Sequence, residues 1–318
     1  MVSRLQRAWL GVILCLAMVS VVWAAPTYNF TTVISPGDPA FTQLLGINNS
    51  GTIAGYSGDG TIVPNKGFTL VLPSSFTAEN FPGSDQTQVI GINAAGDTAG
   101  FYITGGVTHG FTKIGTTFTT VDFTMFGSVL TQLLGINNSD ETAGYWQNAG
   151  GTQFPITWKG GTFTPLDSLL PSNTSAQATG VNNAGDVSGF YVDPTGTNHG
   201  FLLMGTTEKT LDFPGSTFTQ ALGINNAGDV VGVYMAGGAT HGFLYNGTSF
   251  FSIDDPNGVG TTTVNGLNDK GQLVGFYTAA NGNTDGFFAN PVPEPGSLML
   301  TGSGMLVGLA ALRRKLMR

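Results

Sequence analysis

Gly223-Ile-Asn-Asn-Ala-Gly-Asp-Val-Val-Gly-Val-Tyr234 is the clearest of six copies of one motif in this chain of 318 residues. The copies begin at glycines that are 43 to 45 residues apart. They are Gly46, Gly91, Gly135, Gly180, Gly223 and Gly266. A near-constant period in the forties is typical of repeat architectures, whose units cannot bury their apolar faces alone. The repetition therefore predicts one closed array rather than the two ordinary domains that the length would allow.

Each unit contains four short segments with the composition of β-strands. In the fifth unit these are residues 219–225, 229–235, 240–245 and 249–254, rich in β-branched and aromatic side chains and bounded by turn residues. Four short strands in a unit of this length are what one blade of a β-propeller requires. The six units therefore predict an all-β, six-bladed β-propeller of four-stranded blades over residues 25–290.

Two further glycines of the motif predict local geometry. Asn226-Ala-Gly-Asp229 predicts a tight hairpin whose glycine adopts positive φ, and Asp140, which tolerates this conformation, replaces that glycine in the third unit. A second glycine is followed by large aromatic residues, which predicts a close approach of backbone or ring between neighbouring sheets. It stands at Gly55, Gly100, Gly144, Gly189, Gly232 and Gly275.

The two ends of the repeat region predict that the ring closes. The last unit ends with its third strand, residues 285–290, and has no fourth. At the other end, Asn29-Phe-Thr-Thr-Val-Ile34 precedes the first unit and matches the fourth strand of the second unit, residues 117–122. We therefore expect the N-terminal strand to complete the last blade. An open β-solenoid is the alternative, but it would not need this exchange of a strand.

The composition excludes some classes of partner. Charged residues make up only 9% of the chain, which contains 48 glycines. Between the terminal segments stand five lysines, no arginine and 18 acidic residues, a net charge of −13. Such a surface repels phosphate backbones, so nucleic acid and anionic membrane are poor partners. Divalent cations or neutral polysaccharide are tolerated.

Residues 1–24 have the pattern of a secretory signal peptide, expected to form a helix. Two arginines precede an apolar run from Leu10 to Val22, and Val22-Trp-Ala24 ends in the small residue of a cleavage site. An uncleaved membrane anchor is the alternative. The single cysteine, Cys15, lies in this segment, so the mature chain has no disulfide and no thiolate nucleophile.

Residues 291–318 differ in character from the repeats. Pro291-Val-Pro-Glu-Pro-Gly296 predicts a stiff, extended linker. Residues 297–312 carry no charge, and the basic residues that follow fit the cytoplasmic end of a transmembrane helix, although 16 residues are shorter than a comfortable span. A buried core helix is the alternative, but it fits poorly between a proline-rich linker and a basic terminus.

This tail resembles the PEP-CTERM sorting signal of Gram-negative bacteria, with its proline-rich motif, glycine-bearing apolar segment and basic end in fixed order. The residues that carry the sorting motif are Pro293, Glu294, Pro295, Arg313 and Arg314. The resemblance implies export, transient anchoring in the inner membrane, and processing by an exosortase, a membrane-embedded transpeptidase-like enzyme. It also implies a place at the cell surface or in an extracellular matrix rich in exopolysaccharide.

The repeats resemble the HAF repeats of extracellular proteins, which are named for a His-Ala-Phe triplet in the third strand. Here the triplet reads His-Gly-Phe in three units, at His109, His199 and His241, and the other three units lack the histidine. These three residues are the candidate ligand-facing positions. Repetition favours a structural role for them, as imidazoles hydrogen-bonded between blades or at a strand edge. A shared metal ion would require them to converge on one axis, and no metal or cofactor is predicted.

The Asn pairs of the motif allow two interpretations. They are Asn48-Asn49, Asn137-Asn138, Asn182-Asn183 and Asn225-Asn226. They could line a channel as a ring, or their side chains could bond to the backbone of their own hairpin turns, as Asn side chains commonly do. The stretch also bears some likeness to a calcium loop, but it lacks the required acidic spacing and the late glutamate.

We expect a non-catalytic surface or matrix module that binds exopolysaccharide or protein, or that serves as a structural element. The alternative is a propeller enzyme, glycosidase- or lyase-like, acting on extracellular polysaccharide with a pair of acids that depart from the repeat. The candidate acids are Glu79, Asp140, Glu141, Asp193 and Glu208. An enzyme would bring such acids together at one end of the channel, and a binding module would show repeated polar or aromatic groups around a rim.

Overall fold

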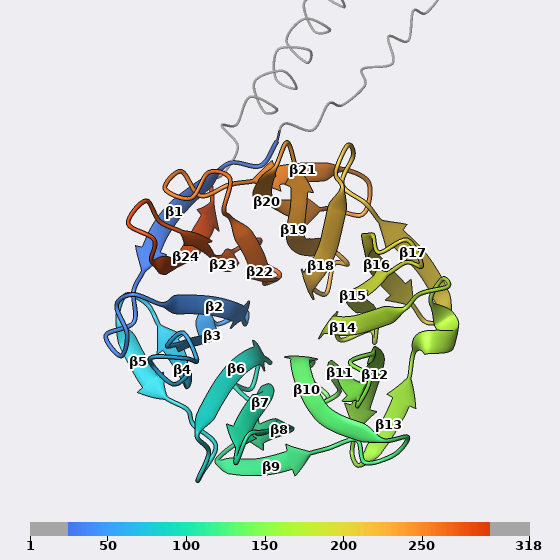
Figure 1. The fold of residues 1–318 in the computed structure, drawn as a ribbon. Coiled ribbons are helices and arrows are strands. Elements are labelled where there is room, and N and C mark those ends of the chain that lie inside the picture. Colours follow the sequence, from blue (N-terminus) through green and yellow to red (C-terminus); the bar gives the residue numbers. More distant parts are fainter. Residues whose placement is uncertain (1–24, 293–318) are drawn as a thin grey trace, which may run out of the picture.

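The computed structural model describes residues 25–292 and forms a ring of six antiparallel sheets, each of four strands (Figure 1). This arrangement confirms the predicted all-β, six-bladed β-propeller. The predicted signal helix of residues 1–24, the transmembrane helix and the sorting residues from Pro293 onward lie outside the described residues. Within residues 25–292, no helix is long and apolar enough to cross a membrane.

Five blades are each built from four consecutive strands, which are ordered outward from the ring axis, and the sixth takes its outermost strand from the N-terminal end of the chain (Figure 1). The first strands, next to the axis, are β2 (Thr42–Ile47), β6 (Gln86–Ile92), β10 (Ser128–Ile136), β14 (Ser175–Val181), β18 (Phe218–Ile224) and β22 (Thr263–Leu267). The second strands are β3 (Thr52–Ser57), β7 (Thr98–Thr104), β11 (Thr142–Asn148), β15 (Val187–Val192), β19 (Val230–Ala236) and β23 (Leu273–Thr278).

The outer half of each blade has the same order. The third strands are β4 (Lys66–Val71), β8 (Val107–Ile114), β12 (Gln153–Lys159), β16 (Asn198–Met204), β20 (Ala239–Tyr245) and β24 (Thr284–Pro291). The outermost strands are β5 (Ser75–Ala78), β9 (Thr117–Val121), β13 (Thr162–Pro165), β17 (Thr207–Leu211), β21 (Phe250–Ile253) and β1 (Tyr28–Val33). A short 3₁₀ helix, η1 (Asp167–Leu169), follows β13.

The ring closes through its N-terminal strand, as the sequence predicts. β1 pairs antiparallel with β24 over its whole length, from Tyr28 opposite Pro291 to Val33 opposite Gly286. A side-chain bond of 3.0 Å between the hydroxyls of Thr32 and Tyr277 also ties β1 to β23. The first strand of the chain thereby covers the edge that the last blade would otherwise expose, and the open-solenoid alternative is wrong.

The hairpin glycines adopt the predicted conformation. The five glycines at this position have φ between 72° and 86°, and Asp140, which replaces the sixth, has φ of 58°. Each turn therefore joins the first and second strands of a blade on the same face of the ring. We call this the turn face and the opposite one the wide face.

The expectation for the second glycine is wrong in one respect. A Cβ atom on Gly232 would lie 2.0 Å from the carbonyl oxygen of Gln220 and 2.7 Å from the ring of Phe243. Both residues belong to the same blade, so the crowding is within one sheet, beside the β-bulge of the first strand. The close approach between sheets occurs instead at the glycine that begins the motif. A Cβ on Gly135 would lie 2.9 Å from the Cα of Gly180 in the next blade.

The core lies between neighbouring blades. One cluster joins Leu202 and Leu211 of one blade to Ala221, Val230 and Phe243 of the next. Because each fully buried side chain of this size contributes about 1.5–3 kcal/mol, every blade depends on its neighbours for stability. This explains why six units close into a ring rather than stand alone.

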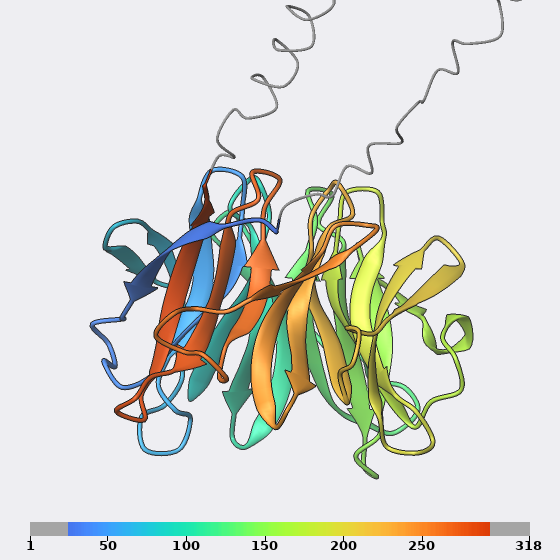
Figure 2. The same cartoon turned by 90° about the horizontal axis from the view of Figure 1, so that it is seen from above.

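Both ends of the described chain lie at the turn face (Figure 2). The last strand ends beside the turn that follows β22, where Gln272 Nε2 donates to Asn290 Oδ1 at 3.0 Å. The backbone N–H of Val292 donates to the carbonyl oxygen of Thr27 at 2.9 Å. The segment that leads toward the C-terminal tail therefore leaves the ring on the turn face.

Removal of residues 25–33 should destabilise the ring, because the edge of β24 and the apolar side chains under β1 become exposed. We expect the thermal unfolding midpoint to fall by about 10 °C or more. A synthetic peptide of residues 27–35 should restore part of the loss, and a scrambled peptide should not. Thermal unfolding followed by circular dichroism tests this, and an unchanged midpoint would contradict the role of β1 in closure.

Candidate functional site

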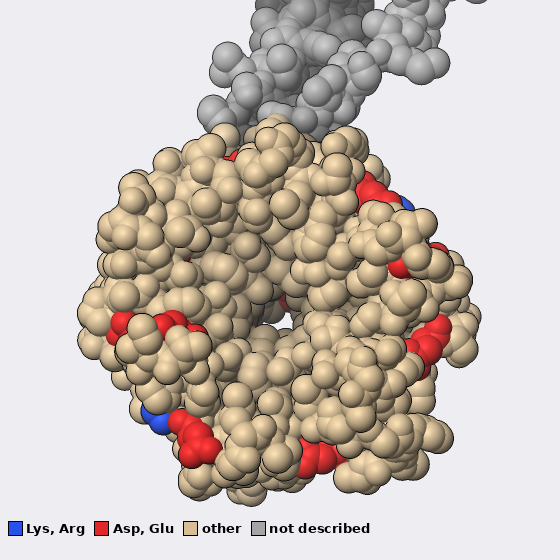
Figure 3. Space-filling view, viewed as in Figure 1, with Lys and Arg blue, Asp and Glu red and all other residues tan. Residues whose placement is uncertain are grey.

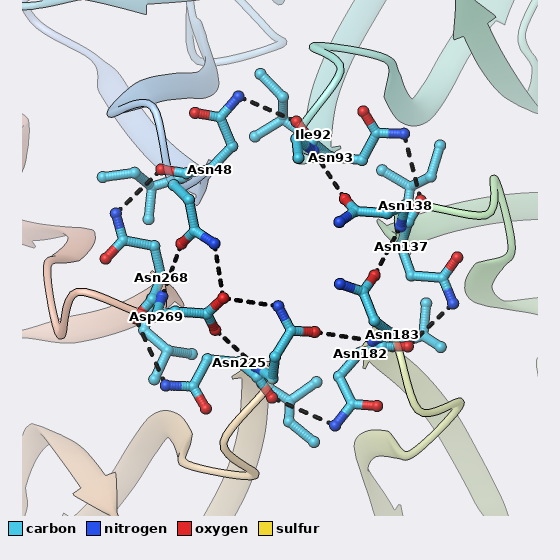
Figure 4. A pocket seen from close by; sticks show the side chains of 18 residues that line it. Asn48, Ile92, Asn93, Asn137, Asn138, Asn182, Asn183, Asn225, Asn268 and Asp269 are labelled. Carbon is cyan, nitrogen blue, oxygen red and sulfur yellow. Dashed lines mark hydrogen bonds between the residues drawn. The ribbon is translucent and has the colours of Figure 1, made fainter.

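A ring of six asparagines surrounds the mouth of the channel at the turn face (Figure 4). The first asparagine of each motif donates from Nδ2 to the backbone oxygen of its counterpart in the next blade, at 3.0 to 3.5 Å. The members are Asn48, Asn93, Asn137, Asn182, Asn225 and Asn268. The last bond, from Asn268 to Asn48, returns to the first blade and makes the circuit complete.

The same asparagines also hold their own hairpin turns. In the fifth unit, Asn225 Oδ1 accepts the backbone N–H groups of Ala227 and Asp229 at 3.0 and 2.9 Å. The hairpin interpretation and the channel-ring interpretation are therefore both correct, because the two ends of one amide serve the two purposes. Asn93 and Asn268 belong to the ring although Ala94 and Asp269 follow them, so a search for Asn-Asn pairs missed them.

The residues that directly follow the ring asparagines lie nearer the axis and form an inner hydrogen-bonded rim with one gap (Figure 4). Asn138 Oδ1, for example, accepts the backbone N–H of Ala94 at 2.9 Å. Ala94 cannot repeat this contact, and Asp269 introduces a carboxylate that accepts the side-chain amides of Asn49 and Asn226. Partial burial alone would raise the pKa of Asp269, but these hydrogen bonds outweigh it and lower the pKa. The cavity at this mouth is only about 80 Å³.

At the wide face the channel opens into a chamber of about 290 Å³. Its lining is contributed by all six first strands and by two phenyl rings of the second strands. The lining residues are Leu45, Gln88, Ile90, Phe101, Gln132, Leu134, Gln177, Thr179, Phe190, Gln220, Leu222 and Asn265. None of these twelve is charged. The surface view shows the charged side chains at the periphery of the ring, apart from one carboxylate visible deep in the central opening (Figure 3).

Each glutamine of the chamber is oriented by one protein hydrogen bond. Gln88 and Gln220 donate from Nε2 to Asn65 and Asn198, at 2.8 and 3.0 Å. Gln177 donates in the same way to Gln153 at 2.9 Å. The fourth glutamine, Gln132, instead accepts the hydroxyl of Tyr145 at 2.8 Å.

These bonds leave the other end of each amide for a ligand. Gln88, Gln177 and Gln220 then offer carbonyl acceptors, and Gln132 offers an N–H₂ donor. Asn265 adds a buried Oδ1 that has no hydrogen-bond partner among the described residues. A buried polar atom without a partner is costly, so a ligand donor at this point would be favourable.

The three histidines lie on the third strands at the wide face, in one repeated arrangement. In each blade His Nδ1 lies 2.7 to 3.0 Å from an aspartate that follows the outermost strand, and the imidazole stacks on a tyrosine of the second strand. The groups are His109, Asp122 and Tyr102; His199, Asp212 and Tyr191; and His241, Asp254 and Tyr234. The partner thus lies within the same blade, not between blades. The histidines do not meet one another.

His199 differs from the other two because a second acid reaches it. Its Nε2 lies 3.5 Å from Asp193 Oδ2. Partial burial alone would lower the pKa of His199, but the hydrogen bonds and charges of Asp212 and Asp193 together raise it above its ordinary value of 6.5.

The candidate catalytic acids lie apart from the chamber. Glu79 is buried and accepts from Thr98 and, at 2.7 Å, from Lys113, as part of the packing between two blades. Asp140 and Glu141 stand in a hairpin at the turn face. Asp193 caps its own turn on Thr195 and Thr197, whose bonds lower its pKa to about 2, and Glu208 lies on β17. The chamber brings none of these five acids together.

No group of three or more histidine, cysteine, aspartate or glutamate side chains within residues 25–292 is arranged to hold a metal ion. The loop with partial likeness to a calcium site is the hairpin turn that the ring asparagines close.

Comparison with known proteins adds one identification. Residues 291–315 match the family model for the PEP-CTERM protein-sorting motif. The chain carries a PEP-CTERM sorting motif. The likeness of its repeats to HAF repeats stays a prediction, and no curated protein sequence matches the chain.

Several solved structures are similar in fold. The fungal Aleuria aurantia lectin, a six-bladed β-propeller, is 11% identical with a TM-score of 0.47, covering 83% of this chain and 91% of that one. A mutant of AofleA from Arthrobotrys oligospora is 12% identical with a TM-score of 0.49, covering 84% and 87%. The BP39L lectin of Burkholderia pseudomallei is 11% identical with a TM-score of 0.42, covering 85% of each chain. At these identities the likeness concerns the fold alone.

The asparagine ring should be a major source of stability. Asn137→Ala removes the donor to Asn182 and leaves turn N–H groups and a buried carbonyl unpaired, so we expect a loss of about 2–4 kcal/mol. Asn138→Ala is the matched control, since the second blade already has alanine at this position; its loss should stay below about 1 kcal/mol. Urea unfolding of both variants compares them, and equal losses would contradict a special role for the ring.

His199 should titrate above its ordinary pKa, and Asp212→Asn should lower that pKa. Because the folded pKa is raised, the contribution of His199 to folding stability is fully present below the unfolded pKa and is lost as pH rises through the folded value. Histidine ring signals followed by NMR across this pH range measure the shift. A His199 pKa that is unchanged by Asp212→Asn would refute the assigned cause.

Proposed function

We propose that this chain is an exported, non-catalytic β-propeller that binds neutral exopolysaccharide at the wide face. We further propose that an exosortase-type enzyme recognises Pro293, Glu294 and Pro295 and processes the tail. The chain would be anchored in the inner membrane before that step. Afterwards it would belong to the cell surface or extracellular matrix.

The observation that carries this proposal is the chamber at the wide mouth. It combines four glutamine amides, each already oriented by a protein bond, with two phenyl rings and aliphatic walls. Neutral sugars present hydroxyl donors and acceptors around an apolar ring face, which matches such a lining. Oriented groups lose little conformational freedom on binding, so they favour affinity. A volume of about 290 Å³ lies at the lower end of ligand pockets and suits one or two sugar residues.

The position of the chain ends supports the same proposal. The linker leaves the ring at the turn face, next to Asn290 and Val292. A ring tethered there would direct its wide mouth away from the membrane and toward the matrix. The narrow asparagine mouth would then lie on the anchored side, where polymer has less access.

The charge distribution favours a neutral ligand. The 18 acids of the body outnumber its five lysines, and neither charge lines the chamber. An anionic polymer would meet net repulsion on approach. The enzyme alternative has weak support, because the departing acids are separated and engaged in local contacts. A purely structural role would leave the oriented amides and the unpartnered Asn265 oxygen without a purpose.

The proposal predicts saturable binding of the full chain to the exopolysaccharide of the bacterium that produces it. The double variant with Gln177→Leu and Gln220→Leu should weaken binding by about tenfold or more, through loss of two oriented acceptors. Gln43→Leu is the matched control, since Gln43 holds the same repeat position but does not line the chamber. Isothermal titration calorimetry, in a detergent without a sugar headgroup, measures the effect.

Two outcomes would contradict this proposal. Absence of saturable binding would remove the binding function and leave a structural module. Shortening of the polysaccharide over time would instead support the enzyme alternative, and Glu79, Glu141, Asp193 and Glu208 would then be replaced one at a time.

A further inference from the structure

A second cavity lies at the junction of the second and third blades, outside the channel. It has a volume of about 210 Å³ and lies between β8, the end of β9 and the start of β10. His109 and Asp122 form one wall, and Val107, Phe123, Val129 and Leu130 contribute apolar surface. The cavity opens near the wide face, because His109 pairs with Tyr102, whose other strand partner Thr87 lies near the beginning of β6.

The histidine–aspartate pair of this cavity has unused hydrogen-bonding capacity. His109 Nδ1 lies 2.7 Å from Asp122 Oδ2, and the imidazole is held against Tyr102 with a centroid distance of 5.0 Å. Because the carboxylate accepts, Nδ1 carries the proton in this bond, and Nε2 is left for another partner. Neither Nε2 nor the second carboxylate oxygen of Asp122 has a hydrogen-bond partner among the described residues.

The equivalent pairs in other blades are more fully engaged. His199 has Asp193 within 3.5 Å of its Nε2. Both oxygens of Asp254 lie 3.0 to 3.2 Å from His241 Nδ1, and one of them also accepts from Ser252. The pair in the second blade therefore keeps two polar atoms without a partner among the described residues. Because the pair also lines a cavity, a ligand in that cavity can bind to them.

The loop beside the cavity departs from the repeat. In three blades a phenylalanine N–H donates to a threonine hydroxyl across this loop, from Phe81 to Thr87, from Phe213 to Thr219, and from Phe123 to Thr131. The separation is six residues in the first two and eight in the third, and the equivalent bonds from Ser35 to Thr42 and from Asp255 to Thr262 span seven. The two additional residues lie between Phe123 and Ser128, at the edge of the cavity.

The longer loop exposes apolar side chains in a strained conformation. Phe126 is 76% exposed, and Met125, Val107 and Val129 are exposed nearby. Phe126 also has φ of 55°, a conformation that is unfavourable for a residue with a bulky side chain. Its ring packs only at 6.1 Å from Phe123 and 6.4 Å from Trp146. An exposed aromatic in strained backbone does not help folding, and such features are typical of binding loops.

We propose that this junction is a second, independent binding site, which takes a single neutral pyranose. Two adjacent hydroxyls of the sugar donate to His109 Nε2 and to the open oxygen of Asp122, and its C–H face lies on Val129, Leu130 and the apolar loop. Asp122 disfavours anionic sugars, and no lysine or arginine lines the cavity. The volume is smaller than most ligand pockets, so it suits one ring rather than a chain.

The site is tested with the full-length chain in a detergent that carries no sugar headgroup. The probes are the methyl glycosides of glucose, mannose, galactose and their 6-deoxy counterparts, observed by saturation-transfer NMR. His109→Phe is the first variant, because Phe154 takes the same position in the third blade and stacks on Trp146. His199→Phe is its matched control. We expect His109→Phe and Asp122→Asn to weaken binding by about tenfold or more and the control to leave it unchanged.

A further variant separates binding from folding. Phe126→Gly removes the exposed ring at a position whose positive φ suits glycine, so it should weaken binding without lowering the unfolding midpoint. All junction variants are compared in the background of the channel variant with Gln177→Leu and Gln220→Leu, which should leave junction binding intact, because the chamber could also hold a single sugar and this background distinguishes the two sites. Failure of all probes to bind, or binding that persists at full strength in both His109→Phe and Asp122→Asn, would overturn the proposal.

Discussion

The closed circuit of six asparagine amides is the interaction on which the rest of the ring depends. Each amide uses its oxygen to close a hairpin within one blade and its nitrogen to bind the backbone of the next blade. The two functions are coupled, so a blade cannot form its inner hairpin correctly without also presenting a donor to its neighbour. In a chain without disulfides, this coupling joins local turn formation to closure of the whole ring. The glycine that begins each motif makes the circuit possible, because no other residue would let six strands converge around the axis.

Much of this architecture could be predicted from the sequence, because it depends on short-range sequence patterns. Strand positions, the positive φ of the hairpin residue and the exchange of β1 all follow from turn residues and from matches between repeats. The second glycine shows the limit. Crowding around Gly232 was predictable, but its cause, the carbonyl of Gln220 at a β-bulge, depends on strand register that no local pattern states. The asparagine ring was one of two alternatives at the sequence level, and the structure shows that one amide makes both contacts.

The chamber and the junction were not predictable for a related reason. Gln88, Gln177 and Gln220 recur with the repeat. The sequence, however, does not indicate which atom of each side-chain amide will form a hydrogen bond to a neighbouring residue. Their orientation comes from Asn65, Gln153 and Asn198, which lie 22 to 24 residues earlier in the chain. These three residues stand at or just before the start of the third strand of the preceding blade. Likewise, the aspartate partners of the histidines lie 13 residues away, across a hairpin. Such pairs become evident only when strand register is known.

The ring also shows how a repeat protein can use some copies of a position for packing between blades and other copies for polar groups without a partner. Where the motif is kept, Phe213 stacks on Tyr234 at 3.6 Å and Tyr234 on His241 at 5.2 Å, which fills the space between blades. Where it is broken, the same positions acquire unsatisfied groups. In the closing blade they are Asp255 and Asp285, whose pKa values are raised by burial and which each keep a carboxylate oxygen without a partner among the described residues.

At the junction of the second and third blades, the departure is a longer loop rather than a buried charge. Neighbouring blades supply enough buried surface to tolerate either change, because each blade is supported on both sides. The turn face, where the asparagine circuit runs, keeps the motif almost without exception. The wide face carries the chamber, the histidines and the exposed Phe126. A ring tethered by its turn face would therefore present its variable face outward, and this is the arrangement that a binding module requires.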